Sequence, residues 1–397
     1  MSSSDSFQHI KNLVQKLMLK EGIKEYDLED KGRIGKGTNF LGDVLFFKVT
    51  TKDAKKVYNL IVKTAKTSDD INGSLPIGLA YQRESFMYRV IFPEMERILT
   101  AGNLKLDYVP RMYLACDDVE KETLILENLH HFGYRTWDRM KAMNMKHVVL
   151  VLEYLGRFHA TSLAMKLREP AKFVECTKDL NSISDEFTKS SSPDMFFDHM
   201  FEHICKLLRK SSRDDLAKKY EEKIGNDVRK MLLNNTSRED KLVISHGDLW
   251  SNNLLFQYNK NSNDPSAVCF IDFQISTLDS PAKDLSFFLY TACDKTILDQ
   301  SESLMETYYR SLSSTMEALG CTCDCFTYKD LLEHFKKYGL CSVISSIFFL
   351  KLTLFRVEEM PEFGEGLANM AVSKMTNENL YLSRILDNFT HFGDNFL

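Results

Sequence analysis

The sequence predicts an α+β protein with two lobes, a small β-rich N-terminal lobe and a large, mainly helical C-terminal lobe. Strand-like apolar runs dominate from Tyr26 to about Glu127, with one helical pattern among them. After Leu129 the pattern is helical, apart from a polar motif between two short apolar runs. We therefore place the lobes at residues 1–127 and 128–397.

The composition is that of an ordinary globular protein. With 397 residues, a formal charge of -5 and 44% hydrophobic residues, the chain can bury a large core. Its slight acidity disfavours nucleic acid as a partner, because that function needs a strongly basic face. Nine scattered cysteines are typical of reduced thiols, so we expect a cytoplasmic protein. The stretch from Cys341 to Phe355 contains Lys351 and is shorter than the ~20 residues of a membrane span, so we expect a core helix and no membrane span.

The N-terminal lobe should contain a leading helix, several strands and one inner helix. Segment 1–20 has apolar residues at helical spacing, namely Phe7, Ile10, Leu13, Val14, Leu17 and Met18. The predicted strands are Val44–Val49, Val57–Thr64, Tyr108–Cys116 and Thr123–Leu126, and the inner helix runs from about Leu79 to Thr100. In the C-terminal lobe we expect helices near Val148–Lys166, Asp194–Lys210 and Asp215–Leu233.

The polar motif, VISHGDLWSNNLLF at residues 243–256, carries the strongest functional signal. It contains His246-x-Asp248-x-x-x-x-Asn253, and Asp272-Phe273-Gln274 follows at the end of the next strand-like run. This is the order of the catalytic loop and metal-binding segment of a phosphotransferase on the protein-kinase plan, except that glutamine replaces glycine. Asp248 is then the candidate base, and oxygens of Asn253 and Asp272 suit Mg²⁺. The competing interpretation is a decorated hairpin with capping Asp and Asn.

The N-terminal lobe supplies candidates for handling the phosphates of ATP. Gly35 and Gly37 lie in a glycine-containing loop between strand-like runs, although its spacing is irregular. Lys63 ends the run Leu-Ile-Val-Lys, which matches the strand lysine that contacts phosphates. Glu84 lies on the inner helix and is the candidate partner of that lysine; an exposed helical glutamate is the alternative. The segment Glu127, Asn128 and Leu129 is placed where a hinge between lobes would offer backbone groups to adenine.

The motif and the run CFIDFQISTLDSPAKDLSFFLYT resemble the ecdysteroid kinase-like family, which is related to aminoglycoside phosphotransferases and choline kinases. The resemblance implies a protein-kinase-like fold and ATP- and Mg²⁺-dependent transfer of the γ-phosphoryl group to an alcohol. It implies that Asp248 orients or deprotonates the hydroxyl, that Asn253 and Asp272 bind Mg²⁺, and that Glu84 positions Lys63 on the phosphates.

Three further residues are not expected to react. His246 should hold the loop by hydrogen bonds, and His159 should be a satisfied core histidine. Asp284 should begin a helix as its cap and steady the loop.

The acceptor should be a small molecule. Asp284 and an apolar run follow Asp272 so soon that no peptide-docking segment fits between them. We expect an acceptor wall in the helical region from about Ser192 to Asn235, whose aromatic and methionine side chains suit a steroid or xenobiotic alcohol, although they could equally be helix core. Those side chains are Met195, Phe196, Phe197, Met200 and Phe201, and Trp250 stands beside the base.

Two other functions remain open at this point. One is phosphorylation of choline or ethanolamine, which a substrate comparison would distinguish. The other is a catalytically inactive nucleotide-binding protein on a kinase fold, for which Gln274 and the irregular glycine loop are the arguments. The sequence does not indicate which hydroxyl is attacked, the oligomeric state or the physiological role.

Overall fold

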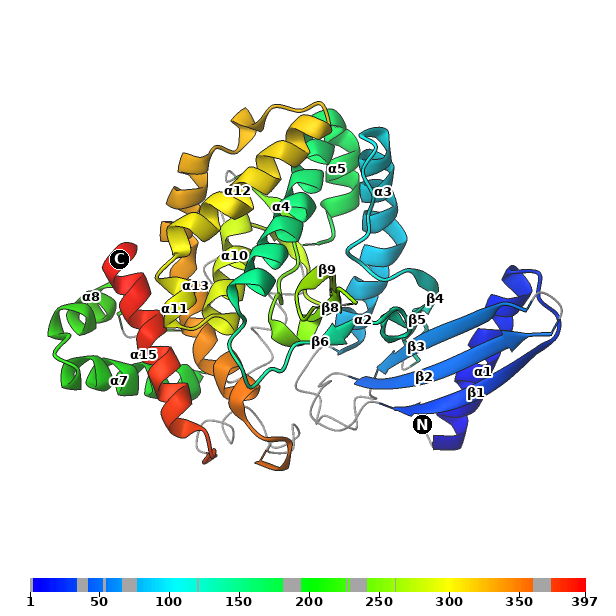
Figure 1. Ribbon diagram of the computed structural model, residues 1–397, viewed down its shortest axis with the longest axis horizontal. Coiled ribbons are helices and arrows are strands. Elements are labelled where there is room, and N and C mark those ends of the chain that lie inside the picture. Colours follow the sequence, from blue (N-terminus) through cyan, green and yellow to red (C-terminus); the bar gives the residue numbers. More distant parts are fainter. Residues whose placement is uncertain are drawn as a thin grey trace.

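The computed structural model describes residues 3–33, 42–52, 55–65, 77–119, 121–180, 194–225, 228, 241–260, 262–359 and 373–397. It has a small lobe built on an antiparallel sheet and a larger, mostly helical lobe (Figure 1). The predicted two-lobed α+β fold is therefore confirmed.

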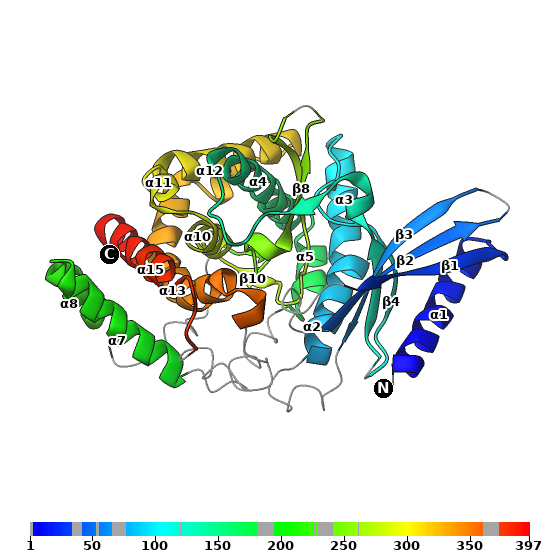
Figure 2. The same ribbon diagram turned by 60° about the horizontal axis from the view of Figure 1, so that its bottom comes forward.

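The small lobe is built on a five-stranded antiparallel sheet. Its strand order is β1 (Tyr26–Arg33), β2 (Gly42–Thr51), β3 (Val57–Ala65), β5 (Thr123–Glu127) and β4 (Met112–Cys116). Helix α1 (Ser3–Lys20) lays the apolar face expected from the sequence against this sheet, with Ile10, Val14 and Met18 buried. Figure 2 shows α1 on one side of the sheet and α2 with α3 on the other.

The inner helix of the small lobe is not one regular α-helix, because a π-helical turn interrupts it. It comprises α2 (Ile77–Phe86), a π-helical turn (Met87–Ile91) and α3 (Phe92–Ala101). Its α2 part contacts β3 and β5, and its α3 part contacts α4 of the large lobe. This stretch therefore connects the sheet that carries Lys63 with the core of the large lobe.

The large lobe is a set of packed helices. They are α4 (Met145–Arg168), α5 (Pro170–Thr177), α7 (Asp194–Lys210), α8 (Asp214–Ile224), α10 (Pro281–Ala292), α11 (Lys295–Leu298), α12 (Ser301–Ala318), α13 (Tyr328–Leu354) and α15 (Glu378–Asn395). Helix α4 packs along α12, and α10 packs along α13. α7 and α8 contact each other and α15, at the side of the lobe away from the sheet (Figures 1 and 2).

Short strands in the large lobe carry the polar motif. β6 (Arg135–Thr136), β8 (Leu254–Tyr258) and β9 (Pro265–Phe270) form one small sheet in the order β6-β8-β9. β7 (Val243–Ser245) pairs with β10 (Thr277–Asp279). The motif thus lies between β7 and β8, and the segment after β9 returns beside it.

Most predicted elements are confirmed, with three corrections. The strand expected to begin at Tyr108 begins at Met112; Tyr108 is instead buried in the core, and its carbonyl oxygen accepts a hydrogen bond from Phe270 N at 2.8 Å. Strand β1 was not among the predicted strands, because six of its eight residues are exposed and charged or glycine, which hides the alternation. β6 and β10 are too short to produce a periodic pattern.

Among the described residues, two apolar segments are long enough to cross a membrane by length and composition alone, Met145–Arg168 and Cys323–Leu354. In each, 72% of the most apolar window is buried inside the protein, as in the core helix of a soluble fold. The expectation that the stretch around Cys341–Phe355 is a core helix is therefore confirmed for α13.

Replacing Gly42 with alanine should destabilise the small lobe, whereas replacing Gly78 should not. A Cβ at Gly42 would lie 1.9 Å from the Tyr81 hydroxyl oxygen and 2.3 Å from the carbonyl oxygen of Thr64, so backbone must move. A Cβ at Gly78 meets only the end of the Glu122 side chain, at 2.9 Å, and gains helix propensity. We expect Gly42→Ala to lower the free energy of unfolding by about 1–3 kcal/mol in urea titrations. Equal effects of the two substitutions would contradict this packing.

His147 should make the fold sensitive to mild acid. The ring is buried, with Nδ1 2.8 Å from Asn144 Oδ1 and Nε2 3.1 Å from the Tyr258 hydroxyl, and burial lowers its pKa to about 4. An unfolded histidine titrates near pH 6.5, so its contribution is complete above that pH and is lost as the pH falls towards about 4. Between pH 6.5 and 4, we expect the free energy of unfolding to fall by about 1–2 kcal/mol less for His147→Gln than for the wild type. The exposed His131→Gln should leave the slope unchanged.

Candidate active site

The polar loop after β7 brings Asp248 and Asn253 into contact. Asn253 Nδ2 donates to Asp248 Oδ2 at 2.9 Å and to the Asp248 carbonyl oxygen at 2.8 Å. A 3₁₀ turn, Ser251–Asn253, closes the loop immediately before β8. Because Nδ2 makes these contacts, the side-chain oxygen Oδ1 of Asn253 takes no part in them and is the atom that would ligate a cation.

Asp248 lies in an environment that suits a general base. Burial raises the pKa of its carboxyl to about 7, the nearby Asp272 carboxylate adds to this effect, and the hydrogen bond from Asn253 opposes it. A base with a pKa near neutrality can accept a proton and release it again at physiological pH. Its second oxygen, Oδ1, is buried and has no hydrogen-bond partner among the described residues.

His246 ties the loop to the neighbouring segment. Its Nε2 donates to the Ile271 carbonyl oxygen at 3.1 Å, and its Nδ1 accepts a weak hydrogen bond from Asp248 N at 3.3 Å. The ring stacks near Phe273 with centroids 4.5 Å apart, and burial lowers its pKa, so the imidazole is neutral. These contacts confirm that His246 holds the loop by hydrogen bonds.

Asp284 of α10 holds the same loop by hydrogen bonds, but it is not the helix cap that we expected. Ser280 caps α10, because its side chain accepts from Ala282 N, and Asp284 lies one turn into the helix. From there Asp284 accepts from His246 N at 2.6 Å and Gly247 N at 2.9 Å. The expectation that Asp284 steadies the loop is confirmed, and the assignment as the cap is wrong.

A buried chain of hydrogen bonds continues from Asp284 into the core. His159 Nε2 lies 3.1 Å from Asp284 Oδ2, and its Nδ1 lies 2.7 Å from the Tyr308 hydroxyl. Burial alone would raise the pKa of Asp284, but His159 and the backbone N–H groups reverse this, and the pKa is lowered. His159 is thus the satisfied core histidine that the sequence indicated.

Gly247 permits the turn that presents Asp248. Its φ of +83° is in the left-handed region, which is costly for residues with a Cβ. A Cβ there would also lie 2.5 Å from the Ile275 carbonyl oxygen. Glycine is therefore required at this position both by its dihedral angle and by its close approach to the neighbouring segment.

The backbone of Asp272-Phe273-Gln274 shows why glutamine can replace the glycine of the Asp-Phe-Gly pattern. The residue with positive φ is Asp272, at +68°, and aspartate tolerates this region better than most residues. Gln274 does not share that conformation, so its position does not require glycine. Phe273 is fully buried and packs against Phe92 of α3, with ring centroids 4.8 Å apart.

Lys63, Glu84 and Asp272 form one buried cluster, although they come from three distant segments. Lys63 Nζ donates to Glu84 Oε2 at 2.6 Å and to Asp272 Oδ1 at 2.9 Å. Burial alone would lower the pKa of Lys63, but the carboxylates of Asp272 and Glu84 outweigh it and raise the pKa. Burial raises the pKa of Glu84, while the ammonium group at 2.6 Å favours its charged form. The predicted pairing of Glu84 with Lys63 is therefore present, and the lysine stays cationic.

The segment Glu127–Leu129 connects the end of β5 to the large lobe, where a hinge was expected. Some of its backbone groups are already engaged, since Glu127 N donates to the Arg111 carbonyl oxygen and Asn128 N to that of Asn59. The Asn128 side chain accepts from His130 N and caps the 3₁₀ turn Leu129–Phe132. Leu129 packs with Leu255 and Cys269 in a small apolar cluster beside the motif strands.

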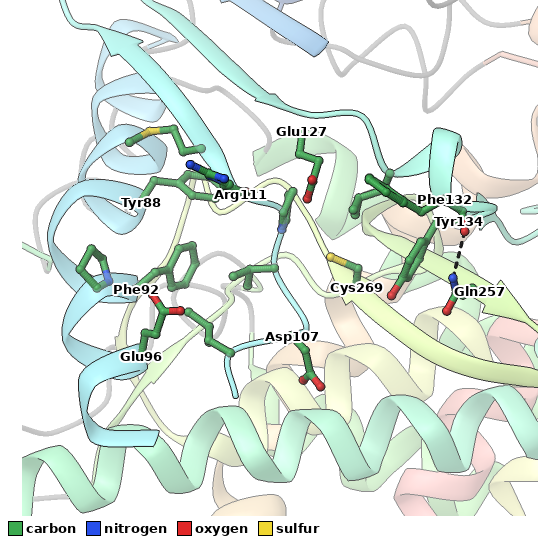
Figure 3. A pocket seen from close by; sticks show the side chains of 16 residues that line it. Tyr88, Phe92, Glu96, Asp107, Arg111, Glu127, Phe132, Tyr134, Gln257 and Cys269 are labelled. Carbon is green, nitrogen blue, oxygen red and sulfur yellow. Dashed lines mark hydrogen bonds between the residues drawn. The ribbon is translucent and has the colours of Figure 1, made fainter. Parts of the chain in front are cut away.

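A cavity of about 810 Å³ lies along this hinge (Figure 3). Tyr88 and Phe92 line it from the inner helix, Glu127 and Leu129 from the hinge, and Cys269 from β9. None of Lys63, Asp248, Asn253 and Asp272 lines it. The cavity therefore adjoins the hinge without reaching the polar cluster, and it is not by itself a site for the phosphates of a nucleotide.

The donor set fits Mg²⁺ better than a transition metal. No group of three or more His, Cys, Asp or Glu side chains able to hold a metal occurs among the described residues. Asp272 and Asn253 nevertheless place one side-chain carboxylate and one side-chain amide oxygen on adjoining segments. The segments are joined by a backbone hydrogen bond from Ile271 N to the main-chain carbonyl oxygen of Asn253, at 3.1 Å. One or two protein oxygens are enough for Mg²⁺, which completes its shell with waters and phosphates.

Some expected site residues cannot be placed. Gly35 and Gly37 lie outside the described residues, as do residues 229–235 of the expected acceptor wall and the side chains of Met195 and Phe196. Met200 and Phe201 of that wall are buried in the main core, which agrees with the helix-core interpretation. The particular partners of Asp284 in the loop, His246 N and Gly247 N, were not predicted, and neither was a second cavity beside Gly247, because each depends on residues far apart in the sequence.

Comparisons with solved structures find proteins that the chain resembles only loosely. The solved structures that resemble the chain include a Plasmodium vivax ethanolamine kinase, with 15% identity over 94% of this chain and 86% of that chain and a TM-score of 0.43. Another is the GDP complex of an aminoglycoside 2'-phosphotransferase-IIIa mutant, with 12% identity, 94% and 99% coverage and a TM-score of 0.41. Both overlaps are too loose to carry an argument about function.

No curated protein matches the chain. The profile of the ecdysteroid kinase-like family, however, matches residues 36–321, well over half of the chain. The matched range includes the polar loop, the segment after β9 and the lysine–glutamate pair. The chain belongs to the ecdysteroid kinase-like family, a family of small-molecule kinases.

Proposed function

We propose that the protein transfers the γ-phosphoryl group of ATP to a hydroxyl of a neutral, lipophilic small molecule, either an ecdysteroid or a xenobiotic alcohol. The observation that carries the proposal is the convergence of Lys63 and Glu84 with Asp272, beside the Asp248–Asn253 contact. These groups come from both lobes, and together they supply the ammonium, carboxylate and amide groups that phosphoryl transfer uses.

Lys63 would bind phosphate oxygens of ATP. Its contact with Glu84 fixes the side chain, and its raised pKa keeps it cationic. Two of the three ammonium protons of Lys63 are donated to Glu84 and Asp272, and the third is left for a phosphate oxygen. Gly35 and Gly37 would cover the phosphates, and backbone groups of Glu127, Asn128 and Leu129 would face adenine.

Asn253 and Asp272 would hold Mg²⁺ through their side-chain oxygens. When bound, Mg²⁺ supplies positive charge to the phosphate oxygens as charge develops on them. Asp248 orients the acceptor hydroxyl and takes its proton, and His246 and Asp284 keep the loop in place for that task.

A panel of acceptors tests the proposal. Purified protein is incubated with Mg²⁺ and ATP and, at equal concentrations, with ecdysone, benzyl alcohol, choline, ethanolamine or kanamycin, and mass spectrometry follows the mass of each acceptor. We expect a phosphate on ecdysone or benzyl alcohol and little on the three cationic compounds. A preference for choline or ethanolamine would contradict the acceptor class. Tight ATP binding without any product would favour an inactive nucleotide-binding protein.

A further inference from the structure

Arg83 is a buried charged side chain that the proposed mechanism does not use. It lies on α2 directly before Glu84, and only 5% of it is exposed. Its guanidinium donates from Nη2 to the main-chain carbonyl oxygen of Asp179 at 2.9 Å. Burial lowers the pKa of Arg83 to about 10, and the Asp179 carboxylate opposes this effect, so the side chain is still cationic at neutral pH. Because burying a charged group is costly, a cation in this position needs an explanation.

Arg83 and Glu84 connect the same helix to two different lobes. Neighbouring positions of a helix point about 100° apart, so the two side chains leave α2 in different directions. Glu84 accepts from Lys63 of β3 in the small lobe, whereas Arg83 donates to the segment that follows α5 in the large lobe. The α2 part of the inner helix packs on β3 and β5 of its own lobe. Arg83 is therefore a polar link from the helix that carries Glu84 to the large lobe.

The segment that accepts this hydrogen bond is itself fixed near the catalytic loop. Its residue Leu180 is fully buried, and the Leu180 carbonyl oxygen accepts from Thr277 Oγ1 at 3.0 Å. Thr277 lies on β10 opposite Ser245 of β7, and Ser245 Oγ donates to the Thr277 carbonyl oxygen at 3.0 Å. Strand β7 leads directly into the catalytic loop. A continuous chain of bonds thus runs from the inner helix to the loop that carries the candidate base.

We propose that Arg83 is a positioning residue, which holds the inner helix against the large lobe and so places Glu84 and Lys63 for catalysis. This inference rests on the proposed kinase function. Lys63 donates both to Glu84 of the small lobe and to Asp272 of the large lobe, so its contacts depend on how the lobes are placed. A displacement of about 1 Å in such a site can cost on the order of 100-fold in rate.

Arg83→Met tests the link, because methionine keeps a long apolar stem and has no donor. We expect kcat with the acceptor found in the panel to fall about 10-fold or more, since the phosphates and the base are no longer aligned. The dissociation constant for Mg²⁺-ATP should change by less than about 3-fold, since the proposed adenine contacts of the hinge are retained. A merely structural role would leave kcat per folded protein, with the folded fraction taken from circular dichroism, unchanged.

Two further variants separate the hydrogen bond from the packing. Arg83→Lys restores a donor on a long side chain and should bring kcat back to within about 3-fold of wild type. Arg97→Met is the matched control, because Arg97 joins the same inner helix to Glu169 of the large lobe, but its side chain is 51% exposed. Surface pairs contribute little, so its kcat should stay unchanged. Equal kcat for Arg83→Met and Arg97→Met would overturn the role of Arg83.

A double-mutant cycle tests whether Arg83 acts through Glu84. Glu84→Gln keeps the shape of the side chain and removes the carboxylate that pairs with Lys63. If Arg83 acts through this pair, adding Arg83→Met to Glu84→Gln should lower kcat by less than about 2-fold more. A further loss as large as that of Arg83→Met alone would contradict the proposal.

Thr277→Val tests the same link from the large lobe. Valine has the shape of threonine but cannot donate to the Leu180 carbonyl oxygen. We expect kcat to fall about 3-fold, because the segment bonded to Arg83 is held less firmly. If Arg83→Met does not fold, a wild-type kcat in Thr277→Val overturns the proposal.

The kinase function and the role of Arg83 fail in different ways, because the placement of Lys63 can be measured without turnover. Only 7% of Lys63 is exposed, so acetic anhydride should modify it slowly in wild type and about 10-fold faster in Arg83→Met, as mass spectrometry of its peptide measures. Faster modification without phosphorylation of any acceptor would support the role of Arg83 and refute the kinase. Equal kcat and equal modification rates in wild type and Arg83→Met would support the kinase and refute the role of Arg83.

Discussion

Asp248→Asn should lower kcat on the order of 10³-fold while leaving the fold intact. The substitution removes the only carboxylate that lies on the loop with an unpartnered oxygen, and an amide cannot take the acceptor proton. Asn253 can still donate to the new amide oxygen, so the loop keeps its closing contact. Steady-state kinetics with the acceptor found in the panel would measure the loss.

The same variant should not be destabilised. Burial raises the pKa of Asp248, which means that the fold holds this carboxylate at a cost. We therefore expect the free energy of unfolding to stay within about 1 kcal/mol of wild type in urea titrations. A variant that retains full activity, or one that loses activity only because it unfolds, would contradict the assignment of Asp248 as the base.

Asp284→Ala should produce the largest loss of stability. The substitution leaves the N–H groups of His246 and Gly247 and the ring of His159 without their shared acceptor in a buried region. Removing one member of such a buried charged network costs about 3–5 kcal/mol of unfolding free energy. Urea or thermal unfolding followed by circular dichroism would measure it.

Asp264→Ala is the matched control for that experiment. Its side chain pairs with Lys146 at the surface, at 2.7 Å, and both are substantially exposed. Surface pairs of this kind contribute at most about 1 kcal/mol. Similar losses for the two alanine variants would mean that Asp284 is not the anchor of the catalytic loop.

The catalytic centre could be predicted largely because its geometry is local. Asp248 and Asn253 are five residues apart, and the loop between β7 and β8 is short enough that spacing alone brings them into contact. Lys63 and Glu84 are 21 residues apart, but one lies on a central strand and the other on the inner helix that packs against it. Their contact therefore follows from the predicted order of elements.

The partners of Asp284, which hold the catalytic loop in place, could not be predicted from local spacing. Asp284 was expected to cap a helix because aspartate is a favoured N-cap residue, yet Ser280 has that role. Its real partners, His246 and Gly247, lie 38 and 37 residues earlier, and nothing in the local pattern indicates their distance. Only the packing of α10 against β7 brings them together.

The acceptor region shows the same limit. Aromatic residues between Ser192 and Asn235 suggested a binding wall, but Met200 and Phe201 are core residues of α7. The cavity next to the catalytic loop is lined from α10 and α13, whose apolar residues read in the sequence as plain helix core. Periodicity identifies buried faces, but it does not distinguish a packed face from one that lines a cavity. The division of the chain at residues 127 and 128 stays a prediction.

The central claim is that the protein moves the γ-phosphoryl group of ATP to an alcohol, and isotope transfer tests it most directly. Wild-type protein and Asp248→Asn are incubated with Mg²⁺, ecdysone and ATP labelled with ¹⁸O in the terminal phosphoryl group, and the steroid is analysed by mass spectrometry. The account predicts a phosphorylated steroid that carries the label with wild type and none with the variant. An unlabelled product, or equal labelled product from both proteins, would contradict it.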